Sequence, residues 1–298
     1  IKRLPDGTPD NGDWHFPKLN FDCPELCEYL WGNMEYWVKN FDIDGYRCDV
    51  GDRVPLEFWR EGVRRVKDIK PDFIMLNEGR KDEWIESGVF DANYCYWGFE
   101  RIFDLGEKNI NKNLKAIKHI NKQTMCFENH DTASDEYENR YERKFGKNVC
   151  DAMLVVTFTC GCVPFIYNGN EIADSCRHSL WNNRFYGKNL CVDWSEALTK
   201  DGKNRTALVK SLIKIYHNIS AINIGDIKVL TESADFTVYK KTHGDREVLV
   251  IANMTKDIQT VSLNGENLSD YQTLLSSRNI IDNNVVTLSD GGYLVLYK

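Results

Sequence analysis

Hydrophobic residues recur at helical spacing in several stretches of the chain, and short apolar runs separate these stretches. The segment from Pro24 to Asn40 is predicted to be a helix, with Asp22 as its cap. A second helix is predicted from Pro55 to Ile69, just before Pro71. Strands are predicted at residues 45–50, 73–76, 90–95, 124–127 and 163–167. Further helices are predicted in a stretch that ends near residue 120 and at 148–159 and 206–222. Alternating strands and helices predict a parallel sheet.

The pattern changes to a period of two after about Gly225. Strands are predicted at residues 237–241, 247–253, 259–263, 271–275, 285–288 and 293–297. Turn sequences such as Asn264-Gly265 and Asp290-Gly291-Gly292 separate several of them, as in an antiparallel sheet. We therefore predict a partial (β/α) barrel at residues 1–224 and a C-terminal antiparallel β-sandwich at residues 225–298.

The predicted barrel is incomplete. An eight-stranded (β/α) barrel needs about 250 residues, more than precede the predicted boundary, and the first predicted helix has no strand before it. We expect the chain to be the back part of a longer protein that supplies the first barrel strands. Made alone, such a segment would expose an open sheet edge and is expected to be poorly soluble or inactive.

Three short segments at expected strand ends each carry a carboxylate. They are Gly45-Tyr46-Arg47-Cys48-Asp49, Met75-Leu76-Asn77-Glu78-Gly79 and Phe127-Glu128-Asn129-His130-Asp131. Barrel enzymes keep their catalytic groups at this end of the strands. An isolated Asp there is more often a cap or an ion-pair partner, but the ordered series of three favours a catalytic site.

Paired carboxylates are the chemistry of glycoside cleavage. A retaining enzyme needs one carboxylic acid to protonate the leaving oxygen and a carboxylate about 5 Å away to attack the anomeric carbon. Asp49 and Glu78 follow successive strands, so this separation is reachable. Arg47 lies two residues before Asp49, on the same side of the strand, and its charge would keep the nucleophile ionised.

The three segments resemble the second, third and fourth signature motifs of the α-amylase family, glycoside hydrolase family 13. The resemblance implies that Asp49 is the nucleophile, Glu78 the general acid/base and Asp131 the third, substrate-distorting carboxylate. The segment from Pro164 to Glu171 is similar to the eighth strand region of that family. The resemblance also implies a (β/α) barrel with a C-terminal β-domain, which agrees with the predicted strands.

The same resemblance implies substrate contacts by Arg47, Asn129 and His130. His130 could alternatively be a buried imidazole that Asp131 orients. Tyr94, Tyr96 and Trp97 could stack on sugar rings, or they could be ordinary core residues. Glu128 lies one residue out of register with the family motif and is interpreted as structural.

Three features depart from the family pattern. Its first motif is absent, and with it a substrate-binding histidine and much of the usual calcium site, so no cofactor and no metal ligand is predicted, although calcium stays open. Asp52-Arg53 stands where many α-amylases have a Lys-His pair, and Asn77 replaces a small residue before Glu78. These changes leave the carboxylates intact but put the substrate specificity in doubt.

The composition argues against nucleic acid and membrane as binding partners. The formal charge of -7 argues against a nucleic-acid surface, and no run of about 18 apolar residues suggests a membrane span. Ten cysteines show no CxxC pair and no zinc spacing, so they are predicted to be reduced, with Cys160 and Cys162 in a buried helix. Reduced cysteines favour a cytoplasmic location.

The predicted activity is therefore hydrolysis of α-glucosidic bonds in starch-like glucans by double displacement. A sugar hydroxyl that replaced water would instead give a branching or glucanotransferase activity. A non-catalytic glycan-binding relative is a further alternative, although such proteins generally lose their carboxylates.

Overall fold

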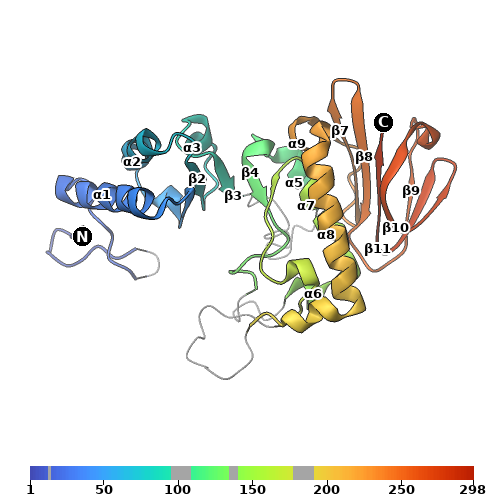
Figure 1. The fold of residues 1–298 in the computed structure, drawn as a ribbon, viewed down its shortest axis with the longest axis horizontal. Helices are drawn as coiled ribbons and strands as arrows, with labels where there is room; N and C mark the ends of the chain where they lie inside the picture. Colours follow the sequence, from blue (N-terminus) through green and yellow to red (C-terminus); the bar gives the residue numbers. More distant parts are fainter. Residues whose placement is uncertain (13–14, 95–108, 134–139, 177–190) are drawn as a thin grey trace. The chain divides into compact units, whose positions relative to one another are not determined.

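The computed structural model describes residues 1–12, 15–94, 109–133, 140–176 and 191–298 (Figure 1). The chain divides into two compact units, residues 1–94 and residues 95–298.

The first unit contains a parallel sheet and the helices that connect its strands. Its elements are α1 (Pro24–Phe41), β1 (Gly45–Cys48), the 3-10 turn η1 (Gly51–Arg53), α2 (Leu56–Ile69), β2 (Ile74–Asn77), α3 (Asp82–Glu86) and β3 (Ala92–Tyr94). Strand β2 pairs in parallel with β1 and with β3, and Cys48 lies opposite Asn77. Because parallel strands end at the same edge, the residues that follow β1 and β2 lie side by side there.

Both ends of helix α1 are set by backbone conformation. Pro24 occupies the first turn, where its missing N–H costs nothing. The cap is Cys23, whose side chain makes no capping bond, so the prediction of Asp22 as the cap was wrong. Asp42 adopts the left-handed conformation, with φ 50°, and its N–H donates to the Val38 carbonyl, which ends the helix.

The core of the first unit forms between α2 and the sheet. Val66 of α2, Met75 of β2 and Phe73, just before β2, are almost completely buried, and Val63 and Phe90 join the same cluster. Complete burial of one such side chain contributes about 1.5–3 kcal/mol relative to leaving it in water. This packing holds β2, and thus the residue that follows it, against the helix layer.

The second unit combines helices, two short parallel strands and an antiparallel sheet. Its first elements are α5 (Ile110–Ala116), η2 (Ile120–Lys122), β4 (Gln123–Met125), α6 (Tyr141–Lys144), α7 (Lys147–Thr159), β5 (Val163–Pro164), η4 (Asn170–Ile172), η5 (Trp194–Leu198), α8 (Lys200–Asn218) and α9 (Ser220–Ile224). The later ones are β6 (Asp226–Val229), β7 (Phe236–His243), β8 (Arg246–Asn253), β9 (Gln259–Ser262), η6 (Leu268–Asp270), β10 (Gln272–Asp282) and β11 (Val285–Tyr297). Strands β4 and β5 are parallel.

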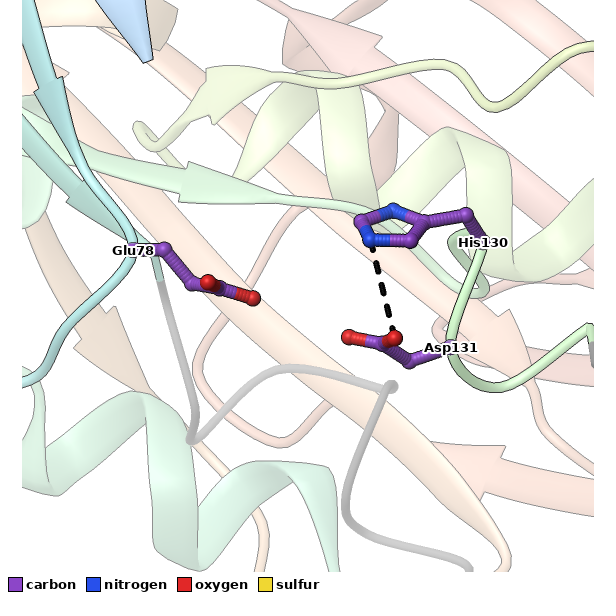
Figure 2. Close-up of side chains that lie close together, drawn as sticks. All are labelled: Glu78, His130 and Asp131. Atoms are coloured by element: carbon purple, nitrogen blue, oxygen red, sulfur yellow. Dashed lines mark ion pairs between the residues drawn. The ribbon is translucent and has the colours of Figure 1, made fainter. Parts of the chain in front are cut away.

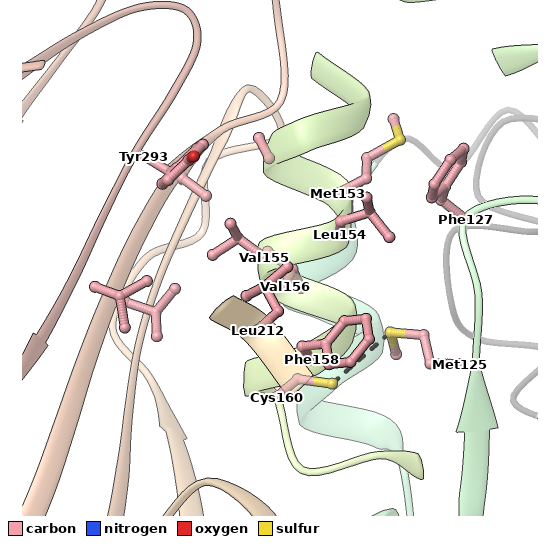
Figure 3. Packing of buried hydrophobic residues seen from close by; sticks show 14 of the residues in the cluster. Met125, Phe127, Met153, Leu154, Val155, Val156, Phe158, Cys160, Leu212 and Tyr293 are labelled. Atoms are coloured by element: carbon pink, nitrogen blue, oxygen red, sulfur yellow. Dashed lines mark hydrogen bonds between the residues drawn. The ribbon is translucent and has the colours of Figure 1, made fainter. Parts of the chain in front are cut away.

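Helix α7 lies at the centre of the largest apolar core. Side chains of α7 point in several directions, toward Met125 and Phe127 near β4, Leu212 of α8 and Tyr293 of β11 (Figure 3). A helix that is apolar all round is a buried one, as the sequence predicts.

The prediction that Cys160 and Cys162 lie in a helix was wrong. The helix ends at Thr159, so Cys160 and Cys162 lie in the bend before β5 rather than in the helix. Both are fully buried, and all cysteines of the described residues are free thiols. The prediction of reduced cysteines agrees with this finding.

The C-terminal sheet is antiparallel, with the order β10-β11-β8-β7-β6 and β9 paired with β11. Residues 285–288 and 293–297, predicted as separate strands, belong to the single strand β11; its first part pairs with β9 and its last part with β8. Between the two parts lie Gly291 and Gly292. Gly291 has φ 59°, and a Cβ there would lie 2.3 Å from the Asn148 carbonyl. The two glycines therefore lie within a continuous strand rather than at its end.

Two further elements differ from the sequence prediction. The helix expected over residues 206–222 begins earlier, at Lys200, and breaks at Ile219 into α8 and α9. Strand β6, which the sequence analysis missed, begins at Asp226. The predicted domain boundary near residue 224 lies between α9 and β6 and stays a prediction. Among the helices of the described residues, none is long and apolar enough to cross a bilayer.

Candidate active site

One guanidinium connects two of the predicted catalytic carboxylates. Asp49 follows β1 directly and Glu78 follows β2 directly. Arg47 donates from Nη1 to Asp49 Oδ1, and its Nη2 lies 2.8 Å from Glu78 Oε1. Because both terminal nitrogens belong to one planar group, the two carboxylates must lie close together. We call Arg47, Asp49 and Glu78 the Arg47 cluster.

The members of the Arg47 cluster differ in access to solvent. The Asp49 side chain is 75% exposed, that of Arg47 31% and that of Glu78 only 10%. A nucleophile must reach the anomeric carbon, and a general acid benefits from a shielded site. The exposures allow these roles, and the roles of Asp49 and Glu78 stay predictions.

Arg47 is a permanent charge in this cluster. Burial alone lowers its pKa, but hydrogen bonds with the Tyr94 hydroxyl and Asp49, and the charge of Glu78, outweigh that effect and raise the pKa. Its Nε donates to the Tyr94 hydroxyl at 3.4 Å, and the guanidinium carbon lies 5.6 Å from the centre of that ring. Tyr94 is buried, so it orients the arginine toward the two carboxylates and has the environment of a core residue, which was the alternative to stacking on sugar.

The backbone after β1 also holds Glu78. The Glu78 N–H donates to the Cys48 carbonyl at 3.0 Å, and the Val50 N–H donates to Glu78 Oε2 at 2.8 Å. Val50 has φ 45°, which is rare for a β-branched residue and costs conformational energy. The strained backbone points an N–H at the carboxylate, and nothing in the sequence indicated this conformation.

Two of the residues that depart from the family pattern, Asn77 and Asp52, contact each other. Asn77 donates from Nδ2 to Asp52 Oδ1 at 2.8 Å and to Asn93 Oδ1 at 2.9 Å. The glycines beside them leave the space for this contact: a Cβ on Gly51 would lie 2.2 Å from Asn77 Oδ1, and one on Gly79 would lie 2.1 Å from Asp52 Oδ1. The sequence analysis treated the two changes separately and missed this pairing.

In the second unit, Asn129 holds the turn that carries Asp131. Asn129 is completely buried, and its Oδ1 accepts from the N–H groups of Asp131, at 3.0 Å, and Thr132, at 3.1 Å. This burial supports a role in shaping the turn. Direct contact of Asn129 with substrate stays a prediction.

His130 and Asp131 are partly accessible. Their side chains are 30% and 41% exposed, and His130 Nε2 lies 3.5 Å from Asp131 Oδ1 (Figure 2). Both groups therefore have surface left for a ligand. The arrangement allows the sugar contact that was predicted for His130, and it equally lets Asp131 orient the imidazole.

Glu128 has a structural environment, as interpreted from its register. It is completely buried and accepts hydrogen bonds from Arg140 Nε at 2.7 Å, the Tyr141 N–H at 2.9 Å and Asn170 Nδ2 at 2.8 Å. Arg140 also binds Asp174 at 2.8 Å. This buried network connects the loops after β4 and β5.

Some predictions are not tested by the structure. Tyr96 and Trp97 lie outside the described residues. Asp49 and Glu78 belong to the first unit and Asp131 to the second, so the convergence of all three stays a prediction.

The sequence profile of the α-amylase catalytic domain matches residues 12–213. The chain belongs to the α-amylase family. The match covers all three carboxylate segments of this α-amylase family member.

Curated relatives of this α-amylase family member include proteins named cyclomaltodextrinase and maltogenic amylase. A cyclomaltodextrinase from Bacillus sp is 28% identical over 280 residues, which cover 86% of this chain and 48% of that protein. A maltogenic α-amylase from Bacillus acidopullulyticus is 29% identical, covering 81% and 42%. An intracellular maltogenic amylase from Bacillus subtilis is 24% identical, covering 94% and 49%. The chain spans about half the length of these relatives.

Solved structures of the family share the fold. An Anoxybacillus α-amylase matches with a TM-score of 0.69 at 22% identity, over 95% of this chain and 65% of that one. An Anoxybacillus pullulanase matches with a TM-score of 0.74 at 14% identity, over 99% and 49%. The fold is thus a portion of the (β/α) barrel of the family followed by its antiparallel β-domain, as the sequence predicts.

Proposed function

We propose that the protein is a retaining glycosidase that cleaves α-glucosidic bonds in starch-like glucans or maltooligosaccharides. The observation that carries this proposal is the Arg47 cluster, in which one arginine contacts an exposed carboxylate, Asp49, and a shielded one, Glu78. The names of the relatives, cyclomaltodextrinase and maltogenic amylase, support α-glucans as the substrate class.

In the proposed reaction Asp49 attacks the anomeric carbon and forms a covalent glycosyl-enzyme while Glu78 gives its proton to the leaving oxygen. Glu78 then removes a proton from water, and the resulting hydroxyl displaces Asp49, so protons and bonds balance without a cofactor. Asp131, with His130 beside it, is proposed to stabilise the distorted sugar in the oxocarbenium-like transition state.

Two further aspects are proposed. Arg47 is proposed to hold the two carboxylates in place, because its guanidinium contacts both of them. The location is proposed to be the cytoplasm, which the free thiols of the described residues and the name of the intracellular relative support.

The test is product analysis on maltohexaose with the full-length protein. Time-resolved proton NMR should show new reducing ends that form first as the α-anomer, and Glu78→Gln should abolish them. An initial β-anomer would contradict retention. Products longer than the substrate would assign a transferase, and maltohexaose binding without new reducing ends would assign a non-catalytic protein.

A further inference from the structure

We propose that Asp52 is a positioning residue for Glu78, and that the loop after the nucleophile holds the general acid in place before substrate binds. This inference rests on the proposed function, because it concerns the same pair of carboxylates. Asp52 does not belong to the Arg47 cluster, but its carboxylate binds the chain on both sides of Glu78.

The contacts form a series along the loop. Cys48, Val50 and Asp52 alternate in sequence, and each binds the segment that carries Glu78. The Cys48 carbonyl accepts from the Glu78 N–H, and the Val50 N–H donates to the Glu78 carboxylate. Asp52 accepts from Asn77 Nδ2 before Glu78, at 2.8 Å, and from the Arg80 N–H after it, at 2.8 Å.

The Asp52 carboxylate is well suited to this role. Its Oδ2 accepts a second backbone bond from the Lys81 N–H at 3.3 Å, while its Oδ1 takes the bond from Asn77. Hydrogen bonds to a carboxylate are stronger than those between neutral groups, because the negative charge of the acceptor assists each bond. One side chain thus fixes the start of the loop after β2 at residues 77, 80 and 81.

Close packing leaves this arrangement little freedom. Asn77 is completely buried, and neither Gly51 nor Gly79 has room for a Cβ beside the Asn77–Asp52 pair. The left-handed φ of Val50 is strained, and such strain persists only where the surroundings enforce it. We infer that the distance between Asp49 and Glu78 is set in the folded protein rather than by substrate binding, as preorganised catalysis requires.

The test compares two substrates that differ in their need for a general acid. Maltohexaose needs a proton on its leaving oxygen, whereas α-maltosyl fluoride releases fluoride with little help from an acid. With the full-length protein, Asp52→Asn should lower kcat/KM on maltohexaose by about 10²-fold, the cost of a misplaced group. Its kcat/KM on α-maltosyl fluoride should change little, because kcat/KM reports only the first step, in which fluoride leaves, and not the later attack of water.

Two variants serve as controls. Asn77→Ala removes the same Asn77–Asp52 bond from the other side and should give the same split between substrates. Asp72→Asn makes the same charge change at an exposed residue of the first unit and should behave as wild type. Thermal melting followed by circular dichroism shows whether each variant is folded.

The outcomes separate this inference from the proposed function. Equal losses on both substrates, or wild-type activity of Asp52→Asn and Asn77→Ala on maltohexaose, would overturn the positioning role. Normal hydrolysis of maltohexaose by Glu78→Gln would instead overturn the proposed function itself.

Discussion

The Arg47 cluster and a second arginine cluster use the same chemical groups in opposite surroundings. In the second unit Arg205 binds Glu142 and Asp151, and we call these three residues the Arg205 cluster. The Arg205 and Glu142 side chains are 1% and 0% exposed, whereas Asp49 is 75% exposed. Arg205 also donates to the carbonyls of Asn170 and Lys147, so its donors are occupied on every nitrogen.

The difference in burial indicates that the Arg205 cluster stabilises the fold, whereas the Arg47 cluster is available for a reaction. Every group of the Arg205 cluster is used inside the protein, where an ionised side chain needs such partners to be stable. The Arg47 cluster leaves an accessible carboxylate beside a fixed positive charge, which is an arrangement that can act on a ligand. Substitutions in the two clusters should therefore affect different measurements.

The largest effect is expected from Asp49→Asn. The amide cannot form the covalent intermediate, so kcat on maltohexaose should fall by at least about 10³-fold. Because Asp49 is exposed, the melting temperature should stay within error of wild type. Steady-state kinetics and thermal melting check both statements, and near-normal turnover would remove Asp49 from the nucleophile role.

The next effect is expected from Arg205→Met, and it should appear in stability. The change leaves Glu142 buried without its charge partner, which costs about 3–5 kcal/mol of unfolding free energy. Chemical denaturation measures this loss. A variant as stable as wild type would show that the buried network contributes nothing net.

A smaller effect, on turnover, is expected from Arg47→Leu. The change removes the group that contacts both carboxylates but leaves Asp49 and Glu78 themselves, and the Val50 N–H still donates to Glu78. We therefore expect kcat on maltohexaose to fall by about 10²-fold, less than in Asp49→Asn. Steady-state kinetics measures this loss, and wild-type turnover would mean that Arg47 does not position the two carboxylates.

The smallest effect is expected at an exposed ion pair. Arg64 pairs with Glu61 and Asp68 on α2, with side-chain exposures of 58%, 31% and 64%. Water and salt screen such pairs, so Arg64→Ala should leave both melting temperature and turnover unchanged. A marked loss of either would blur the distinction between exposed and buried clusters.

Much of the fold was predictable, because local signals agree with the final structure. Pro55 and Pro71 bracket α2, and the apolar run before Glu78 becomes β2, in which Met75 is buried as predicted but Ile74 is exposed. The place of Asp49 and Glu78 after strand ends follows from that alternation alone. The link through Arg47 was also predictable on the side of Asp49, two residues away on the same strand face.

Other features depend on contacts that sequence spacing does not encode. Asn77 and Asp52 are 25 residues apart, and only the parallel register of β1 and β2 brings them together. The positive φ of Val50 could not be predicted, because valine rarely adopts this conformation and only the surrounding contacts enforce it. In β11, Gly291 and Gly292 have the composition of a turn, yet pairing on both sides keeps the strand continuous.

Trapping the covalent intermediate tests the central claim most directly. The full-length protein would be incubated with 5-fluoro-α-glucosyl fluoride, which slows release of the glycosyl-enzyme, and its peptides analysed by mass spectrometry. The account predicts one added fluoroglucosyl group on the peptide that contains Asp49, and none in Asp49→Asn. A label on Glu78 or Asp131, or turnover of the reagent without any label in the wild type, would contradict it.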